Sequence, residues 1–500
     1  MAAILTTAES QTRRREQYHE ADVVVVGAGV FGCTVAYALA NQGRSVLLLE
    51  RWLKEPDRIV GELLQPGGAA SLEQLGLKHC VEGIDAMPCY GYTVIYHGEK
   101  VVIPYPNLDG NSNVTHPWGG HNQIETGKKP AGCCFHHGRF ITNLRNSCIN
   151  HENITVVETE VVKTLRGEQS DQVLGVESRT TNKETGVKEP DYYFGQLTII
   201  ADGYDSKWRK EILKSKPKVC SKFYALELID CELPEPGHGH VIIGNAFPIL
   251  LYQIGTHETR ALIDVPQGIP EASPENGGVR GYIQNFVLPA LPPSLRPSFE
   301  KALEDGKIPR SMPNSWLPPT KQRSNGAILL GDAMNMRHPL TGGGMSVAFN
   351  DVVILAELLH PDRVPNLDDP KAINKALDEL YWRRKPLTGI INVLAQALYA
   401  LFAANDRQLR ALQYGCFSYF KRGTTDGPVA LLGGILQRPL VLAYHFFSVA
   451  FLAIWLNACS VVGCGVFGIL KAPLAIIDAV LILWRACIVF LPIMYRETFQ

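Results

Sequence analysis

Uninterrupted apolar runs mark the first strands along the chain. Residues 23–26 are four consecutive valines, and the runs at 45–49, 197–201 and 327–330 are similarly short and apolar. Runs of this kind are typical of parallel strands that are buried on both faces. An apolar helical stretch at 33–40 follows the first run, so the pattern predicts an α/β fold built on a parallel sheet.

A different pattern occupies residues 216–321. Short apolar stretches such as 241–243 and 261–265 alternate there with polar and turn-forming residues, which predicts a β-sheet that roofs a cavity. The polar segment 106–130, rich in glycine and asparagine, is expected to be an inserted loop.

The C-terminal end is the most hydrophobic part of the chain. Residues 440–470 contain no Asp, Glu, Lys or Arg, and the stretch is longer than the roughly 20 residues that a helix needs to cross a bilayer. The next stretch, 473–495, carries Asp478 and Arg485 on one helical face, which favours an interfacial helix over a lone span. We expect residues 439–500 to anchor the chain to a lipid bilayer, by spanning it or by lying in its surface.

Residues 386–405 form another uncharged stretch, for which two interpretations stay open: a buried core helix or a membrane-associated one. We assign residues 361–438 to a helical region. Residues 1–19 form a polar tail without the apolar core of a secretory signal peptide.

Composition and charge exclude several classes of function. The 500 residues suffice for about three domains. The 48 basic residues are balanced by 49 acidic ones, which leaves no basic face for a nucleic acid. The twelve cysteines are scattered, with no CxxC pair and no cysteine/histidine cluster at zinc spacing, so we expect reduced thiols on the cytosolic side and no metal site.

The first apolar run leads directly into GAGVFG at residues 27–32, a GxGxxG motif. Gly27 permits a tight turn, Gly29 lets the backbone approach a pyrophosphate, and Gly32 allows close helix packing. The second run ends in Glu50, at the spacing from which a carboxylate reaches an adenosine ribose. Strand, glycine loop, helix and acidic residue together predict a Rossmann-like dinucleotide-binding domain.

Two later motifs bear on the choice between FAD and NAD. Residues 201–203 read Ala-Asp-Gly after the third apolar run, and residues 331–333 read Gly-Asp-Ala after the fourth. Ligands gather at the carboxyl ends of such strands. The glycine turn at 342–344 opens a helix whose N-terminal N–H groups can face the pyrimidine edge of a flavin. Each motif alone could be an ordinary turn, but their combination and order favour FAD.

The same motifs carry a resemblance to a known family. Their order resembles the flavin monooxygenases of the para-hydroxybenzoate hydroxylase fold, of the glutathione reductase 2 type. Four further segments resemble the squalene monooxygenase (squalene epoxidase) family in its fungal form. These segments are RIVGELLQPGG at 58–68, FHHGRF at 135–140, SMPNS at 311–315 and NMRHPLTGGGM at 335–345.

The resemblance implies a set of FAD contacts. Arg58 and Arg145 are cations that can meet a pyrophosphate, and Asp332 can accept a hydrogen bond from a ribityl hydroxyl. Ordinary surface ion pairing is the alternative for either arginine. Including the glycine loop, the expected cofactor-binding residues are Gly27, Gly29, Val30, Phe31, Gly32, Glu50, Arg51, Arg58, Leu63, Arg145, Val161, Asp332, Gly344 and Met345.

The family reaction adds one atom of molecular oxygen across the terminal 2,3 double bond of squalene, through a flavin C4a-hydroperoxide, to give (3S)-2,3-oxidosqualene for sterol (ergosterol) biosynthesis. The resemblance therefore implies squalene and oxygen as substrates, FAD as cofactor and NADPH as an indirect electron source through NADPH-cytochrome P450 reductase. It also implies the endoplasmic reticulum (microsomal) membrane, with the catalytic domain facing the cytosol. Because the cofactor carries out the difficult chemistry, the protein has to bind and orient the substrate and to exclude water from the site.

Four residues are expected by resemblance in the substrate or inhibitor pocket. A hydrogen bond between the Tyr92 hydroxyl and the Gln65 amide could position the flavin-facing wall, which gives Tyr92 a supporting catalytic role. Leu398 and Phe402, at i and i+4, supply an apolar wall, with ordinary helix packing as the alternative. Since a hydrocarbon offers no hydrogen bonds, the length and shape of the cavity must set specificity.

The expected domains are a discontinuous FAD-binding domain at 20–105, 131–215 and 322–360, a substrate domain at 216–321, a helical region at 361–438 and membrane-associated helices at 439–500. Two alternatives stay open: a flavoenzyme of the same fold acting on prenyl lipids or quinones, and a membrane-attached flavin electron carrier or lipid-binding protein. An epoxide product would exclude the first, and squalene-linked oxygen consumption would exclude the second.

Overall fold

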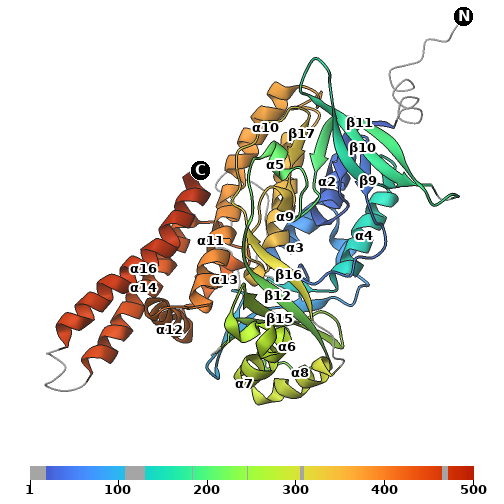
Figure 1. Cartoon of the computed structure of the whole chain (residues 1–500). Helices are drawn as coiled ribbons and strands as arrows, with labels where there is room; N and C mark the ends of the chain where they lie inside the picture. The colour runs from blue at the N-terminus through green and yellow to red at the C-terminus, as the bar shows by residue number, and fades with distance from the viewer. Residues whose placement is uncertain are drawn as a thin grey trace, which may run out of the picture.

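The computed structural model describes residues 19–106, 130–182, 184–244, 246–304, 309–463 and 471–499. The expected tail at 1–19 and inserted loop at 106–130 therefore lie outside the described residues, apart from the residues at their edges. The described strands form three sheets, and a group of C-terminal helices extends away from them (Figure 1).

The first sheet is parallel at its centre. Strand β1 (Glu20–Val26) lies between β2 (Val46–Glu50) and β11 (Lys188–Ile200), and both neighbours run parallel to it. The side chains of Val23, Val24 and Val25 are completely buried, as a continuous apolar run requires. The outer strands are β8 (Ile154–Glu158) beside β2, then β10 (Val173–Thr181) and β9 (Glu160–Arg166) antiparallel beyond β11, with β17 (Ala327–Leu329) parallel to β11.

Five helices pack together around this sheet. Helix α2 (Val30–Ala40) follows the glycine loop and contacts both α4 (His137–Ile149) and α9 (Gly344–Leu358). Helix α9 in turn contacts α3 (Pro66–Gln74) and α10 (Pro370–Arg383). Segments far apart in the sequence thus share one hydrophobic core, which runs from the valines of β1 to the leucines of α10.

The second sheet has seven strands, all antiparallel except for one pair. Its order is β16 (Arg310–Trp316), β12 (Lys218–Ile229), β15 (Glu258–Pro266), β14 (Ile249–Gln253), β13 (Gly239–Ile243), β5 (Gly91–Tyr96) and β6 (Glu99–Pro104). The sequence assigned β5 and β6 to the FAD-binding segment 20–105. They lie instead in the sheet formed by strands of the segment 216–321, because β5 pairs in parallel with β13. A small third sheet joins β3 (Leu63–Leu64), β7 (Gly132–Cys134) and β4 (Met87–Cys89).

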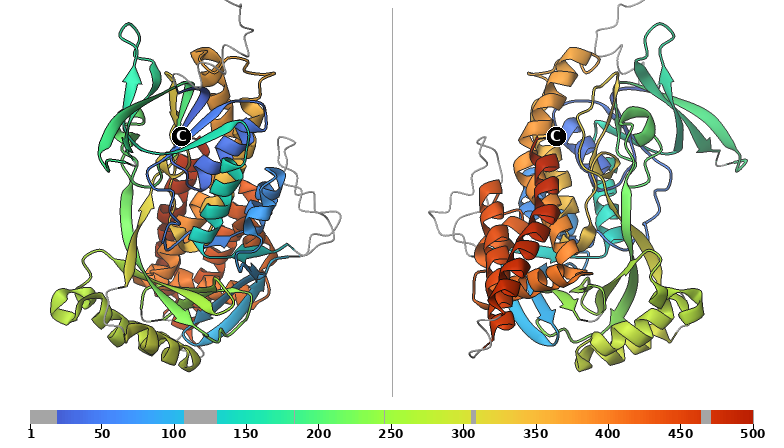
Figure 2. Two further views of the ribbon diagram at one scale, coloured as in Figure 1. Left: turned by 90° about the vertical axis from the view of Figure 1, so that its right-hand side faces the viewer. Right: turned by 60° about the vertical axis from the view of Figure 1, so that its left-hand side comes forward.

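The two faces of the second sheet bury different partners. Ile242 packs in the cluster formed with the helices α6 (Gly278–Tyr282) and α8 (Arg296–Leu303), which lie at one end of the molecule in Figures 1 and 2. Its neighbours Val241 and Ile243 point to the opposite face and share a cluster with residues of the C-terminal helices. This alternation is the period-2 pattern of a sheet that is buried on both sides.

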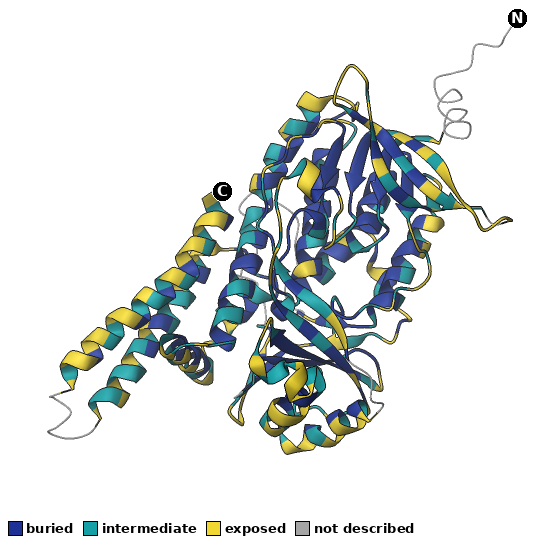
Figure 3. Ribbon diagram, in the orientation of Figure 1, coloured by how far each residue is buried: buried dark blue, intermediate teal, exposed yellow. Residues whose placement is uncertain are grey.

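The described residues of the C-terminal region form helices joined by short connections. Its helices are α11 (Lys385–Phe402), α12 (Arg407–Lys421), α13 (Asp426–Leu432), α14 (Pro439–Val462) and α16 (Ala472–Phe499). Helices α11, α14 and α16 are each long and apolar enough to cross a membrane. The buried share of the apolar window is 56% in α11, but only 17% in α14 and 22% in α16. Helix α11 is therefore a core helix of the body, whereas α14 and α16 expose an apolar surface, drawn yellow in Figure 3.

The two charges in the last apolar stretch face protein rather than an exposed surface. Asp478 of α16 pairs with Arg407, and Arg485 pairs with Asp406 at 2.8 Å, both at the start of α12. These ion pairs join α16 to α12, and the other side chains of α16 from Ala472 to Met494 are apolar. Asp478 and Arg485 thus do not require an interfacial position, which removes the reason for preferring one over a span.

Candidate active site

The glycine loop has the geometry of a tight nucleotide-binding turn. Gly27 has a φ of +101°, and a Cβ there would lie 2.6 Å from the carbonyl oxygen of Ala201. A Cβ on Gly32 would lie 1.8 Å from the carbonyl oxygen of Gly27. A Cβ on Gly29, in contrast, would meet no atom within 4 Å. Gly27 and Gly32 therefore shape the loop, while Gly29 leaves its backbone open to a ligand.

Glu50 and Arg145 hold this loop from the side. The backbone N–H of Ala28 donates to Glu50 Oε2 at 2.8 Å, and Arg145 Nε donates to the carbonyl oxygen of Ala28 at 3.0 Å. Arg145 Nη2 also lies 3.6 Å from Glu50 Oε2, and both side chains are largely buried. The residues expected at the adenosine ribose and at the pyrophosphate thus also contact each other and fix the loop between them.

Arg209 connects the two later motifs. Its Nε donates to the carbonyl oxygen of Ala333 at 2.9 Å, and its Nη2 donates to those of Gly203 and Asp332, both at 3.2 Å. One guanidinium group therefore joins the Ala-Asp-Gly turn after β11 to the Gly-Asp-Ala turn after β17.

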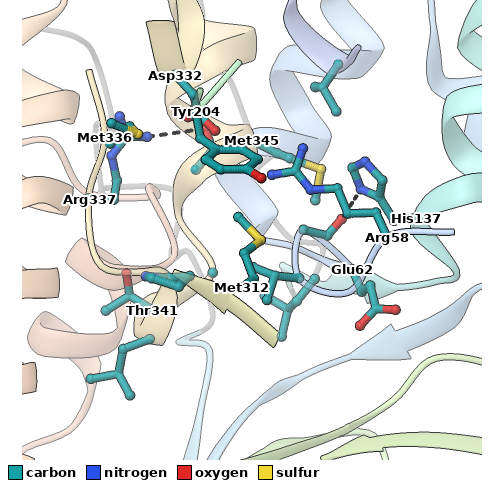
Figure 4. Close-up of a pocket in the computed structure, with 18 of the residues that line it drawn as sticks. Arg58, Glu62, His137, Tyr204, Met312, Asp332, Met336, Arg337, Thr341 and Met345 are labelled. Carbon is teal, nitrogen blue, oxygen red and sulfur yellow. Dashed lines mark hydrogen bonds between the residues drawn. The ribbon is translucent and has the colours of Figure 1, made fainter. Parts of the chain in front are cut away.

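A cavity of about 210 Å³ extends from the glycine loop to the second sheet (Figure 4). The first residues of α2 and of α9 both line it, so two helix N-termini, each with partial positive charge, face the same space. The predicted residues on its wall are Gly29, Val30, Phe31, Arg58, Leu63, Tyr92, Asp332, Gly344 and Met345. Six of the predicted cofactor-binding residues lie off this wall. They are Gly27, Gly32, Glu50 and Arg145 in or beside the glycine loop, Val161 buried in the core, and Arg51, whose guanidinium stacks on Trp52.

Beside Arg58, His137 is buried and neutral. Its Nδ1 donates to the carbonyl oxygen of Gly61 at 2.8 Å, the contact dashed in Figure 4. Burial, with the Arg58 guanidinium second, lowers the pKa of His137 to about 3. A neutral imidazole held by a backbone carbonyl acts as a structural support for the cavity wall and does not carry a proton at neutral pH.

Glu62 forms a buried ion pair at the edge of the cavity. Arg260 of β15 donates to both carboxylate oxygens, at 2.9 to 3.2 Å, and the Tyr252 hydroxyl donates to Oε2 at 3.1 Å. Burial raises the pKa of Glu62, while its bonds to Arg260 and Tyr252 act in the opposite direction. The pair connects the loop at residue 62 with the second sheet.

Gln65, Tyr92 and Tyr105 form a hydrogen-bonded group at the flavin-facing turn. The Gln65 amide donates to the Tyr92 hydroxyl, the contact that the sequence led us to expect, and also to the carbonyl oxygen of Thr341 at 2.7 Å. The Tyr105 hydroxyl donates to Gln65 Oε1 at 2.5 Å, and the Tyr92 hydroxyl donates to Thr341 at 3.3 Å. Burial raises the pKa of Tyr92, so the phenol stays protonated. These bonds set the position of Thr341, the last residue before the glycine turn.

A second cavity of about 110 Å³ adjoins the first and is apolar. Leu398 and Phe402 line it, together with residues of α12, α13, α14 and α16. Tyr92, Val241, Leu340 and Thr341 line both cavities. The two spaces therefore meet at the wall that the Gln65 group supports.

Several wall residues were not predicted. Arg337 and Glu62 occupy motifs that were used only to recognise the family, so their individual roles were missed. Tyr204, which follows the Ala-Asp-Gly turn, and Met312, in the SMPNS segment, gave no signal of chemistry. Their side chains point into the cavity in Figure 4.

Comparison with solved structures defines the class of protein. The chain is similar to PqsL of Pseudomonas aeruginosa, a probable FAD-dependent monooxygenase, with a TM-score of 0.61 and 20% identity, over 78% of this chain and 98% of that one. It is similar to p-nitrophenol 4-monooxygenase PnpA of Pseudomonas putida with a TM-score of 0.61 and 18% identity, over 85% and 98% of the two chains. Residues 22–55 match the model for FAD dependent oxidoreductases. The fold is that of the FAD-dependent monooxygenases.

Sequence comparison defines the family within this class. Residues 194–477 match the family model for squalene epoxidase. The chain is 85% identical to squalene epoxidase ERG1 of Gibberella zeae over the full length of both, and 50% identical to squalene epoxidase erg1 of Aspergillus fumigatus over 97% of this chain and 95% of that protein. It is 39% identical to squalene monooxygenase of Mus musculus, over 95% and 78% of the two chains. The chain belongs to the squalene epoxidase family.

Proposed function

We propose that this chain uses FAD and molecular oxygen to convert squalene to (3S)-2,3-oxidosqualene. The observation that carries the proposal is the junction of the two cavities: an apolar space without a charged side chain on its wall shares Tyr92 and Thr341 with the glycine-lined space beside it. With two reducing equivalents and two protons from NADPH and solvent, one oxygen atom enters the product and the other leaves as water.

The residues of the first cavity fit FAD. The open backbone at Gly29 and the N-terminus of α2 suit the pyrophosphate, with Arg58 supplying positive charge. The Asp332 carboxylate on the wall suits a ribityl hydroxyl, and the N-terminus of α9 at Gly344 suits the flavin ring. When bound, FAD supplies the oxygen-activating chemistry.

The chain's own task is to bind and orient a hydrocarbon away from water. Leu398, Phe402 and Phe446 belong to an apolar wall that offers shape but no hydrogen bonds. Leu340 and Thr341 bring this wall to the cofactor cavity. Specificity therefore rests on cavity length and on exclusion of water from the reacting double bond.

We propose further that squalene reaches the site from a lipid bilayer. Residues of α14 and α16, such as Leu442, Val449 and Phe490, line the apolar cavity, and other side chains of the same helices are exposed and apolar. A substrate dissolved in lipid would thus enter between the helices that contact the lipid. The family resemblance supports the endoplasmic reticulum membrane, a cytosolic catalytic domain and NADPH-cytochrome P450 reductase as the electron donor.

The test is mass spectrometry of the lipid products. Detergent-solubilised full-length protein is incubated in air with FAD, NADPH, a P450 reductase and squalene. We expect 2,3-oxidosqualene, and its loss when the reductase is omitted. If squalene stays intact while bound FAD is reduced, the proposal fails and quinones and prenyl lipids become the substrates to examine.

A further inference from the structure

A buried polar cluster lies directly behind the glycine turn at the cofactor cavity. Its members come from four separate parts of the chain, and each side chain is at least 92% buried. They are Asn335 and Arg337 before the turn, Asp351 of α9, Arg384 beside α11, Asn392 of α11 and Glu497 of α16. The last of these belongs to the helix whose other side chains form the exposed apolar surface.

Hydrogen bonds lead from Glu497 to the cavity wall. Asn392 Nδ2 donates to Glu497 Oε2 at 3.0 Å and lies 3.3 Å from Asn335 Oδ1. Arg337 Nη2 donates to the same Asn335 oxygen at 2.7 Å, and Arg337 Nη1 lies 3.4 Å from the carbonyl oxygen of Gly344. Arg337 and Gly344 both line the cofactor cavity. A carboxylate on the anchor helix is therefore connected to the residue that opens α9.

The charges of the cluster depend on one another. Arg384 forms an ion pair with Asp351, whose carboxylate accepts from both Nε and Nη2, at 2.6 to 3.0 Å. Arg337 has no carboxylate in salt-bridge contact among the residues that the structure describes, and its charge is balanced at longer range by Asp332, Asp351 and Glu497. Glu497 is therefore linked to Arg337 through the side chains of Asn392 and Asn335.

The end of α16 is seated on the catalytic body. A Cβ added to Gly389 of α11 would lie 3.7 Å from Glu497 Cβ, so the two helices approach closely at this point. The Arg496 guanidinium lies over the ring of Trp316 in β16, 5.5 Å from its centroid. Figure 1 shows the C-terminal end of α16 returning to the body beside α11. The same helix exposes Trp484 and Ile488 further from this end.

We propose that Glu497 is a positioning residue for the flavin-facing turn, which it holds through Asn392, Asn335 and Arg337 when α16 is seated on the body. The geometry of the cofactor site then depends on the placement of the anchor helix. This inference rests on the proposed function, because it assumes that the cavity beside Gly344 holds FAD.

The test compares E497A, E497D and E497Q with T498A, a matched change in the same helical turn outside the cluster. Each full-length protein is purified with FAD, and three quantities are measured: the visible circular dichroism of the bound flavin, the FAD dissociation constant, and hydrogen peroxide formed per oxidosqualene. E497A is expected to alter the flavin spectrum, weaken FAD binding about tenfold, as for the loss of roughly one buried hydrogen bond, and raise the peroxide ratio. E497Q, which keeps an acceptor for Asn392, is expected to restore the spectrum, and T498A to match the parent.

A merely structural role would lower thermal stability without changing the flavin spectrum or the peroxide ratio of the folded protein, and that result in E497A would overturn the proposal. If E497A does not fold, E497D tests the proposal, because its shorter side chain keeps the carboxylate but moves it away from Asn392. E497D should then show the same changes in the flavin spectrum, FAD binding and peroxide ratio. Failure of the proposed function is distinct: the parent protein itself would then form no oxidosqualene.

Discussion

Gly29 and Gly32 are three residues apart in one loop, but their surroundings differ completely. A methyl group on Gly32 would overlap the carbonyl oxygen of Gly27, whereas one on Gly29 would enter open space at the cofactor cavity. A single residue type thus serves the fold at one position and the ligand at the other.

G29A and G32A should therefore fail in different ways. We expect G29A to keep its melting temperature without FAD but to weaken FAD binding by about tenfold or more, because the added methyl group keeps the pyrophosphate from the backbone. G32A should lower the melting temperature as well, because α2 must move away from the loop. Thermal melts of the apoprotein and FAD titration measure both effects, and equal melting temperatures for the two variants would contradict the assignment.

Y92F tests the hydrogen bonds at the junction of the two cavities. The change removes the hydroxyl that donates to Thr341 and accepts from Gln65. We expect kcat to fall about five- to tenfold, since roughly 1 kcal/mol of positioning is lost, with little change in KM because the phenyl ring remains. Steady-state epoxidation measures this. Y96F, which alters the same strand outside either cavity wall, is the control, and an equal loss there would refute a specific role for Tyr92.

Sequence motifs predicted single residues well where the contacts are local or carried by a family motif. The GxGxxG loop and the contact between Gln65 and Tyr92 are of this kind. The bond between Arg145 and the carbonyl oxygen of Ala28 joins residues 117 positions apart, and the one between Asn392 and Glu497 joins residues 105 positions apart. Contacts of this kind follow from how helices pack, which one sequence does not reveal.

At the scale of elements, hydrophobicity found the helices but not their surroundings. Residues of α11 and α14 look alike as uncharged stretches, but α11 packs against the body while α14 and α16 expose Leu440, Trp455 and Trp484. The placement of β5 was missed for a related reason, because its parallel partner β13 lies far along the chain. Non-local pairing, rather than local preference, decides both cases.

The exposed face of α16 provides a prediction about membrane binding. Glutamates in I476E/V480E would face the bilayer, where a charge near the centre costs about 2.5–3.5 kcal/mol. We expect this double variant to float less with liposomes. V187E/I229E places the same substitutions at exposed positions of the body and should float like the parent protein. Unchanged flotation of I476E/V480E would show that this face does not contact lipid.

At the scale of the whole molecule, buried histidines set the response to acid. Burial lowers the pKa of His137 and His338 to about 3 and that of His240 to about 4. As the pH falls below about 6.5, the three histidines take up protons in the unfolded chain but not in the folded one. Their contribution to the free energy of unfolding is therefore fully present above pH 6.5 and is lost as the pH falls. Asp264 acts oppositely, because burial raises its pKa to about 6.

We therefore expect these four groups together to lower the free energy of unfolding by about 2–3 kcal/mol per pH unit between pH 6 and pH 4, with three histidines offset by one aspartate. Burial also raises the pKa of Glu62 and Asp202, which reduces the net slope further. Urea denaturation across this range measures the slope. H240Q removes one of the three titrating histidines and should reduce the slope of the free energy of unfolding by about 1.4 kcal/mol per pH unit. A slope identical to that of the parent protein would show that His240 is not buried in its neutral form.

The central position of β1 in the first sheet affects how the chain is made. Strand β1 ends at residue 26, but its neighbour β11 begins at residue 188 and β17 at residue 327. At about 5–20 residues per second, β11, the strand that pairs with this edge of β1, leaves the ribosome about 8–32 s after β1. For this time one edge of a four-valine strand has no partner, which makes the nascent chain prone to aggregation. We therefore expect the nascent chain to depend on chaperones that bind extended apolar segments until β11 has been made.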